Sequence, residues 1–113
     1  MVRQFKFKAW DKEEKLLVRL NAIDCSKGKL HKKGHILLQF TGLFDKHETE
    51  VYENDILLSD NSKIMVVWNE DQLCWSQVSE KEPENKMRLN REQIGKSIKL
   101  CNYHEAPQSF TAQ

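Results

Sequence analysis

The chain has 113 residues, of which 31% are charged and 39% are hydrophobic, and its formal net charge is +1. This length and balance are typical of one globular domain with its own core and exclude a disordered chain. The near-neutral charge also argues against a protein whose whole surface binds nucleic acid, but it is compatible with a local basic patch.

The apolar runs are only a few residues long, far short of the roughly 18–20 residues that span a bilayer. Residues 1–6 lack the apolar core of a secretory signal. The three cysteines, Cys25, Cys74 and Cys101, are far apart and form no C-x-x-C pair, which suits reduced thiols better than disulfides or a zinc site. We therefore expect a cytoplasmic protein with no membrane association, no metal and no cofactor.

The first third of the chain predicts two strands and a loop. Residues 3–10 predict a strand in which Phe5, Phe7 and Ala9 face the core, because they alternate with polar residues. Residues 16–23 predict a second strand, with a short helix as the alternative. Residues 24–35 are polar and contain two glycines, so they predict a loop.

The middle of the chain predicts a strand, a reversal and another strand. Residues 36–40 predict the first strand, and Thr41-Gly42 predicts a sharp reversal after it. Residues 45–48 predict an exposed turn in which Asp45 bonds the backbone two residues further on. Residues 51–58 predict an extended segment, in which Asn54 is able to adopt the left-handed conformation.

A hairpin is the clearest prediction in the second half. Residues 63–68 and 73–78 flank a four-residue connection. On one face of this hairpin we expect Trp68 in the first arm and Leu73 and Trp75 in the second, as part of the core.

The remainder predicts a charged loop at residues 79–86, a capped helical turn and a last strand. Asn90 followed by Gln93 resembles a capping box, and Gly95 is expected to end the turn. Residues 97–102 predict the strand, with Ile98 and Leu100 facing inward. The fold class that follows is mainly β: a small antiparallel, partly open barrel, SH3-like in part, with at most short helical turns.

Five segments together carry a family resemblance. They are F-K-F-K-A-W-D at 5–11, Q-F-T-G-L-F-D-K at 39–46, E-V-Y-E-N-D-I at 50–56, V-V-W at 66–68 and N-Y-H-E-A-P at 102–107. In this order they resemble landmarks of the YopX family of small phage and prophage proteins. Asn54 and Cys101 stand where the family has glycine, and His47-Glu48 stands where it usually has N-G.

The resemblance implies a predominantly β fold and a phage or prophage origin, and it brings no activity. It places a single YopX-like β domain at residues 1–107 and leaves a frayed C-terminal tail at 108–113. The motif residues are of structural kinds, with aromatics for the core and polar residues or glycine for turns. They are Trp10, Asp11, Thr41, Gly42, Asp45, Tyr52, Asp55, Trp68, Asn102 and Pro107.

No catalytic constellation emerges from the residue pattern, so we do not expect an enzyme. Glu53 and Asp55 share a strand parity, but Asp55 is better explained as bonding backbone at the start of a strand. His31 and His35 lie four residues apart in a glycine-containing segment that disfavours a helix, which argues against a metal pair. Cys101 lies close to His104 in sequence, and a buried thiol is the simpler interpretation.

Two hypotheses remain. The first is a non-enzymatic accessory module that binds an unknown host or phage protein, or a second copy of itself, through an exposed strand edge. The second is a nucleic-acid-binding module that uses the basic loop at residues 27–35, with Trp10 or Phe44 as stacking surfaces. Its contacts would be Lys27, Lys29, Lys32 and Lys33, whose simpler role is to keep a loop solvated.

Overall fold

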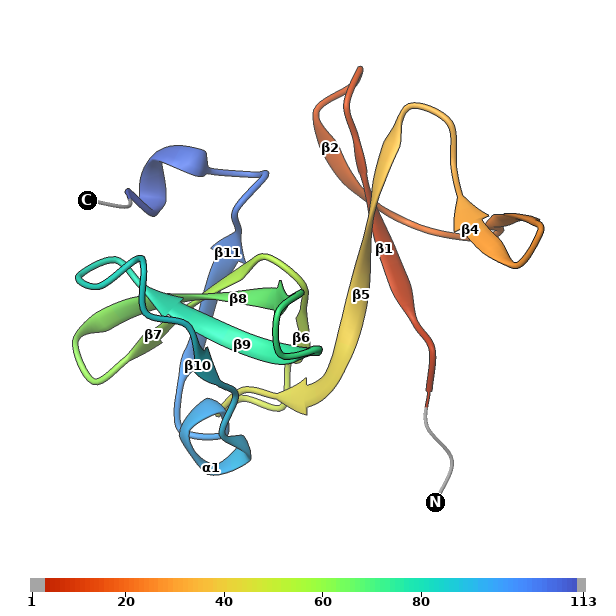
Figure 1. Cartoon of the computed structure of the whole chain (residues 1–113). Helices are drawn as coiled ribbons and strands as arrows, with labels where there is room; N and C mark the ends of the chain where they lie inside the picture. Colours follow the sequence, from red (N-terminus) through yellow and green to blue (C-terminus); the bar gives the residue numbers. More distant parts are fainter. Residues whose placement is uncertain (1–3, 112–113) are drawn as a thin grey trace.

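Over the described residues, the chain folds into a mainly β, partly open barrel with one short α-helix, which confirms the predicted fold class (Figure 1). The computed structural model describes residues 4–111. The strands are β1 (Phe7–Asp11), β2 (Leu16–Arg19), β3 (Asp24–Ser26), β4 (Lys29–His31), β5 (His35–Phe44), β6 (Glu50–Tyr52), β7 (Asp55–Ser59), β8 (Ser62–Asn69), β9 (Cys74–Ser79), β10 (Met87–Arg88) and β11 (Ile98–Asn102). The helix α1 spans Arg91–Ile94, and a 3-10 turn, η1, spans Pro107–Ser109.

Two sheets share the barrel, and β5 is the longest strand of the first. That sheet has four strands in the order β2-β1-β5-β6, and the second has five strands in the order β10-β9-β8-β7-β11. Figure 1 shows β5 running down from the β1–β2 part of the molecule toward the second sheet, and its end pairs with β6. A turn at residues 53–54 separates β6 from β7, so the predicted extended segment at residues 51–58 is interrupted. Asn54 lies in this turn with a φ of +67°, the left-handed conformation that the sequence allowed for it.

The first strand begins later than predicted. Pairing starts at Phe7, which lies opposite Gln39 of β5. Ala9 is fully buried, but Phe5 precedes the strand and is 66% exposed, so its predicted core position is wrong. The predicted start of the strand at Arg3 lies outside the described residues.

We predicted a loop at residues 24–35, and this prediction is wrong. Asp24–Ser26 and Lys29–His31 pair as the two-stranded hairpin β3–β4, which projects from the barrel (Figure 1). Its two central residues, Lys27 and Gly28, have φ values of +52° and +80°. Consecutive positive φ values are typical of the tight hairpin turn whose twist matches that of paired strands, so a polar composition concealed a hairpin.

The predicted reversal at Thr41-Gly42 is also wrong, because β5 continues through these residues to Phe44. Gly42 has a φ of +89°, and the pairing of β5 with β6 shifts register between Phe40 and Phe44. Glycine therefore serves a bulge that bends a continuous strand. The reversal comes at residues 45–49, where the carboxylate of Asp45 accepts the N–H of His47 at 2.8 Å, as predicted.

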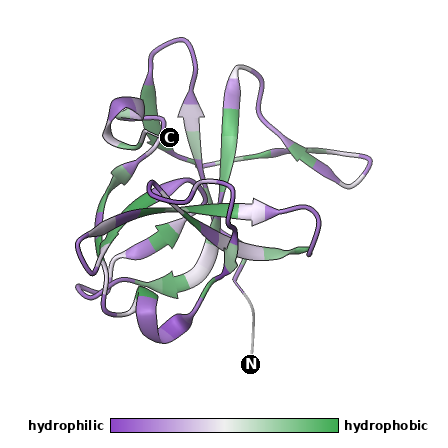
Figure 2. Ribbon diagram, turned by 60° about the vertical axis from the view of Figure 1, so that its left-hand side comes forward, coloured by the Kyte–Doolittle hydropathy of each residue, from purple (hydrophilic) through white to green (hydrophobic). Residues whose placement is uncertain are grey.

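The two apolar core clusters centre on the second sheet but include residues from other elements, and Figure 2 shows hydrophobic segments on several strands. One core cluster contains Val51, Leu57, Ile64, Val66 and Ile94, and the other contains Ile56, Val78 and Phe110. Each cluster joins residues that are distant in the sequence. Folding of this sheet therefore depends on non-local contacts.

The β8–β9 hairpin forms as predicted, with Trp68 directly opposite Trp75. Its tryptophans do not reach the centre of the core, because Trp68 is 38% exposed and Trp75 is partly buried. Leu73, predicted to face inward, lies in the connection with a φ of +53° and is 71% exposed.

Asn90 caps α1 as predicted, since its side chain accepts the N–H groups of Glu92 and Gln93 at 2.8 and 3.1 Å. The Gln93 side chain does not close a capping box. It donates instead to the hydroxyl of Ser59, 3.1 Å away. Gly95 ends the helix with an ordinary right-handed φ of −66°.

The end of the chain is more ordered than the sequence suggested. A register shift between Lys99 and Cys101 leaves Leu100 46% exposed, so the prediction that it faces inward is wrong. The predicted frayed tail is wrong for residues 108–111. Phe110 is 5% exposed, and the carbonyl of Ser109 accepts the ammonium group of Lys63 at 2.7 Å.

Candidate functional site

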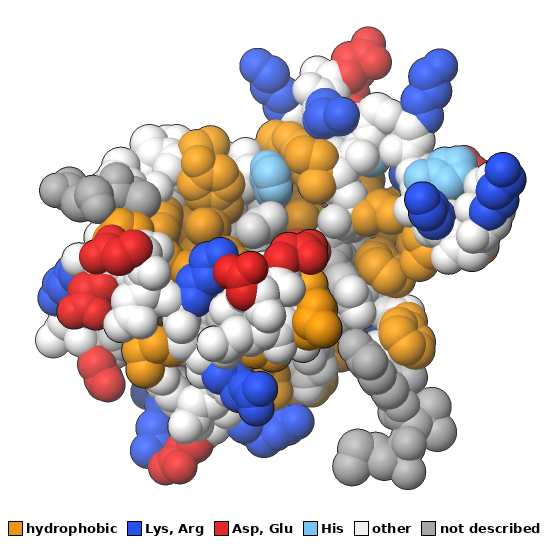
Figure 3. Space-filling model, in the orientation of Figure 1, with side chains coloured by type: hydrophobic (Ala, Val, Ile, Leu, Met, Phe, Trp, Pro, Cys, Tyr) orange, Lys and Arg blue, Asp and Glu red, His pale blue; other side chains and the backbone are white. Residues whose placement is uncertain are grey.

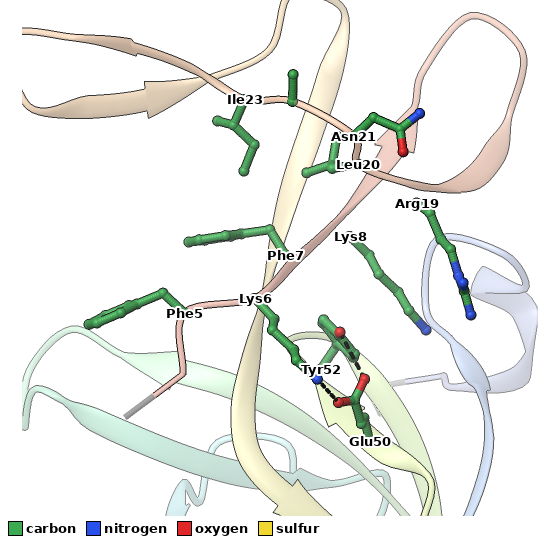
Figure 4. A pocket seen from close by; sticks show the side chains of 11 residues that line it. Phe5, Lys6, Phe7, Lys8, Arg19, Leu20, Asn21, Ile23, Glu50 and Tyr52 are labelled. Carbon is green, nitrogen blue, oxygen red and sulfur yellow. Dashed lines mark hydrogen bonds and ion pairs between the residues drawn. The ribbon is translucent and has the colours of Figure 1, made fainter. Parts of the chain in front are cut away.

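A cleft of about 710 Å³ opens beside β1 and is shown in Figure 4. We call it the β1 cleft. It combines cationic, aromatic and aliphatic side chains from β1, β2 and β6 and the segments next to them. Its lining residues are Phe5, Lys6, Phe7, Lys8, Arg19, Leu20, Asn21, Ala22, Ile23, Glu50 and Tyr52.

Strand periodicity sorts these side chains into two halves. Successive residues of an extended chain point to opposite faces. Lys6 and Lys8 therefore lie on one side of β1 and Phe5 and Phe7 on the other, as Figure 4 shows. The strand β1 therefore forms a ridge that divides the cleft. The half of the cleft on one side of the ridge is apolar, and the half on the other side is basic.

The basic half holds two cations that the protein does not neutralise by ion pairing. Lys8 lies directly opposite Arg19 in the β1–β2 pairing, so the two side chains lie on the same face of these strands. Lys6 is different, because it forms an ion pair with Glu50. Within residues 4–111, neither Lys8 nor Arg19 forms an ion pair with a carboxylate. An anion bound between them would be attracted by both charges.

Tyr52 forms the floor of this half and is only 4% exposed. The ammonium groups of Lys8 and Lys99 lie 4.6 and 5.7 Å from the centre of its ring, within the range of cation–π attraction. Burial, together with the charge of Glu50, raises the pKa of Tyr52 to about 12, and its hydroxyl donates to Glu50 at 3.1 Å. Burial and the charge of Lys99 lower the pKa of Lys8.

Tyr52 is held in place by a buried polar network at the start of β7. Its backbone N–H donates to Oδ2 of Asp55 at 2.6 Å. The side-chain amide of Asn102 donates to Oδ1 of the same carboxylate, and also to the carbonyl of Glu53, both at 3.0 Å. Lys99 completes the network with an ion pair to Asp55. These contacts link β11 to the floor of the cleft.

The other motif residues hold turns and packing contacts away from the cleft. Thr41 donates from its hydroxyl to the carbonyl of Val51 at 2.8 Å. Asp11 accepts the N–H groups of Glu13 and Glu14 in the turn after β1. Pro107 begins η1.

The four lysines predicted for nucleic acid are not part of the β1 cleft. Lys29 lies in β4, and Lys27 lies in the turn between β3 and β4. Lys32 and Lys33 lie between β4 and β5, and only Lys32 is partly buried. Figure 3 shows basic side chains gathered on the projecting hairpin. The ring of Trp10 stacks on His104 at 5.8 Å, and Phe44 is 46% exposed.

The residues considered for chemistry are not brought together. Asp55 is held in the buried network with Tyr52, Asn102 and Lys99. Glu53 lines a different cavity, together with Gln39 and two tryptophans. The thiol of Cys101 lies 3.5 Å from the hydroxyl of Ser109, whereas His104 packs against Trp10 and Tyr103. The part of the chain that the structure describes contains no cluster of three His, Cys, Asp or Glu side chains placed to hold a metal ion.

Sequence reasoning missed the cleft residues because the alternation in F-K-F-K was interpreted only as a half-buried strand. The same alternation gives the ridge its two halves. Arg19 could not be identified in advance, because its position opposite Lys8 depends on the register of β1 against β2.

The fold and the cleft define a small, partly open β-barrel domain with a basic and aromatic groove. A family model described as "YopX protein" matches residues 6–110, and the chain therefore belongs to the YopX family. It is similar to the crystal structure of protein EF1440 from Enterococcus faecalis, with a TM-score of 0.68 and 21% identity over 96% of this chain and 99% of that one. That likeness concerns the fold.

No match was found among curated proteins. Within residues 4–111, none of the helices has the length and apolar character that a membrane crossing needs.

Proposed function

We propose that this protein is a non-enzymatic module that binds single-stranded nucleic acid across β1. The observation that supports this most strongly is the pairing of Lys8 with Arg19 beside Phe5 and Phe7 in one cleft. Proteins that bind single strands combine a basic groove for phosphates with aromatic side chains on which bases stack. The β1 ridge has basic side chains on one side and aromatic side chains on the other.

The geometry suggests how a strand would lie. A phosphate would occupy the position between Lys8 and Arg19, where two positive charges face each other. A base on the other side of the ridge would contact Phe5, which is 66% exposed, and Phe7. Glu50 would not oppose the phosphate strongly, because Lys6 and the Tyr52 hydroxyl already engage its carboxylate.

The same engagement supports a binding role over a catalytic one. A general base needs a carboxylate that is free to take a proton from a substrate. In the cleft, Lys6 holds the pKa of Glu50 below its ordinary value of 4.5 against the opposing effect of burial. Glu50 is therefore suited to positioning its neighbours.

Fluorescence anisotropy with a labelled single-stranded oligonucleotide tests this proposal. Lys8→Gln with Arg19→Gln should weaken binding at least about tenfold at low salt. It should also make the slope of log K against log salt shallower by about 0.7, as expected when one phosphate contact is lost. Phe5→Ala should weaken binding by about tenfold through lost stacking, without changing that slope.

The matched control is Lys27→Gln with Lys29→Gln, which removes the same charge from the β3–β4 hairpin. Unchanged affinity in this control is expected. If the control loses affinity and the Lys8 and Arg19 variant does not, the binding site is the hairpin and the proposal for the cleft is wrong.

A second candidate function is binding of a protein, or of a second copy of the chain, at the edge of the first sheet. Strand β2 ends that sheet and pairs only with β1 among the described strands, and Leu16 on it is 57% exposed. An open edge can accept another strand. Leu16→Lys should then abolish the complex, with a second copy or with a partner protein, that sedimentation velocity detects. Leu73→Lys, on the exposed β8–β9 connection, should leave that complex intact.

The proposed setting is the cytoplasm of a bacterial host that carries a phage or prophage. The reason for this proposal is the resemblance of the five sequence segments to small phage and prophage proteins. A nucleic-acid module of this kind would act as an accessory protein. Its expression during prophage induction, measured by quantitative proteomics of the host, tests the setting separately from binding.

A further inference from the structure

A second, smaller cavity lies at the end of the β8–β9 hairpin. It has a volume of about 260 Å³ and is lined by Gln39, Glu53, Trp68 and Trp75. We call it the Trp–Glu pocket. It shares no lining residue with the β1 cleft, so what it binds is independent of the proposed function. Its size suits a small head group, since pockets for drug-sized ligands begin at roughly 300 Å³.

Two indole rings form the aromatic part of the pocket. Trp68 and Trp75 lie directly opposite each other across the hairpin, with ring centroids 5.2 Å apart and planes at 78°. Trp75 also packs against the first core cluster, which fixes its position, while Trp68 is 38% exposed. Tryptophan has the most favourable ring face for a cation.

Glu53 supplies a carboxylate that has no cation. It lies in the turn between β6 and β7, and its Oε1 accepts only the backbone N–H of Gln39, at a long 3.4 Å. No lysine, arginine or histidine of residues 4–111 forms an ion pair with it. By contrast, Asp55 and Glu50 each have a lysine partner. Burial raises the pKa of Glu53 above its ordinary value of 4.5, so the folded protein bears the cost of this unpaired charge.

We propose that the Trp–Glu pocket binds an organic cation of the alkylammonium class. Its methylated ammonium head would have the two indole rings on one side and the carboxylate of Glu53 on the other. The rings attract the cation through their π faces, and the carboxylate neutralises it. A methylated ammonium is weakly hydrated and apolar in shape, which suits a half-buried aromatic site. The same head group occurs in free small cations and on methylated lysine side chains.

Isothermal titration calorimetry with choline tests the proposal, with 3,3-dimethyl-1-butanol as an uncharged molecule of the same shape. Choline should bind saturably with a millimolar dissociation constant, and at least about fivefold more tightly than the neutral compound. Equal binding of the two would show a hydrophobic pocket and overturn the proposal. So would the absence of saturable choline binding up to about 50 mM, which lies well beyond the millimolar range.

Two variants locate the binding. Glu53→Gln keeps a side-chain oxygen for the Gln39 N–H, and Trp68→Leu alters a ring that is already partly exposed, so both should fold. Each should weaken choline binding at least about fivefold. Glu70→Gln, in the exposed connection of the same hairpin, is the matched control and should leave it unchanged. Affinity that survives Glu53→Gln would contradict the assignment of the carboxylate.

A third ligand distinguishes the two sources of the cation. N-acetyl-trimethyllysine amide presents the same head group on a peptide-like stem. If it binds more tightly than choline, the occupant is a modified side chain of a partner protein. If choline binds as tightly or more tightly, the occupant is a free small cation.

Discussion

The ammonium group of Lys99 on β11 lies 3.0 Å from the carboxylate of Asp55 on the neighbouring strand β7, and the Asp55 side chain is 1% exposed. This carboxylate also accepts the backbone N–H of Tyr52, which forms the floor of the β1 cleft. One buried pair therefore joins the last strand of the barrel to the candidate site.

Replacing Asp55 should be costly for stability. Asp55→Ala leaves Lys99 partly buried without its partner and also removes an acceptor from Tyr52 and Asn102. Breaking such a pair costs about 3 kcal/mol of unfolding free energy, which urea unfolding would measure. Glu92→Ala is the control, because its ion pair with Lys96 is exposed, and it should cost no more than about 0.5 kcal/mol. Similar losses for the two variants would contradict the structural role of Asp55.

Asp45 should make the fold sensitive to acid. Burial disfavours its charge, but the N–H groups of Lys99, Thr49 and His47 outweigh burial and hold its pKa below the ordinary 3.8. Because the folded pKa is lower than the unfolded one, the ionised carboxylate contributes stability above the unfolded pKa. That stability is lost as the pH falls through the folded pKa.

The corresponding variant is Asp45→Asn. It should lower the unfolding free energy by about 2 kcal/mol near neutral pH, the scale of hydrogen bonds to a charged group. The loss should shrink as the pH falls below about 4. Urea unfolding across this range measures it, with Glu48→Gln in the same turn as the control. A loss that stays constant with pH would show that the charge of Asp45 does not matter.

Replacing Phe110 should lower the stability of the fold more than replacing Leu100. The sequence predictions of a frayed tail and an inward-facing Leu100 imply the opposite order. Phe110 packs with Ile56 and Val78 and is 5% exposed, whereas Leu100 is 46% exposed. Phe110→Ala should cost about 3 kcal/mol, and Leu100→Ala less than about 1 kcal/mol. Thermal or urea unfolding decides between them. A larger cost for Leu100→Ala would mean that the register of β11 is wrong.

The sequence was most informative where one short-range interaction determines the local structure. The cap of Asn90 on α1, the contact of Asp45 with the N–H of His47, and the left-handed Asn54 all depend on neighbouring residues and form as predicted. The Trp68–Trp75 pairing also follows from one hairpin and its connection length.

The errors at Gly42, Leu100 and Phe110 share a different cause, because each depends on contact with a distant part of the chain. Gly42 has the positive φ that glycine permits, but its pairing with β6 makes the site a bulge and not a reversal. Leu100 faces solvent because of a bulge that only the β7–β11 register reveals. The buried partners of Phe110, which are Ile56 and Val78, lie more than thirty residues earlier in the chain. Periodicity cannot report such contacts.

The candidate sites were hidden for the same reason. The lysines at residues 27–33 formed a visible cluster in the sequence, whereas Lys8 and Arg19 meet only through the β1–β2 register. Glu53 and the two tryptophans come from separate elements. In each case, the chemistry depends on which strands lie side by side.

The most direct test of the β1 cleft is a backbone amide NMR titration with a short single-stranded oligonucleotide. Shifts that saturate and cluster at residues 5–8 and 19–23 are the predicted result, because these residues line both sides of the ridge. They should fade as salt is raised. Shifts confined to residues 24–35, or no shifts at low salt, would contradict the account of the cleft as a nucleic-acid site.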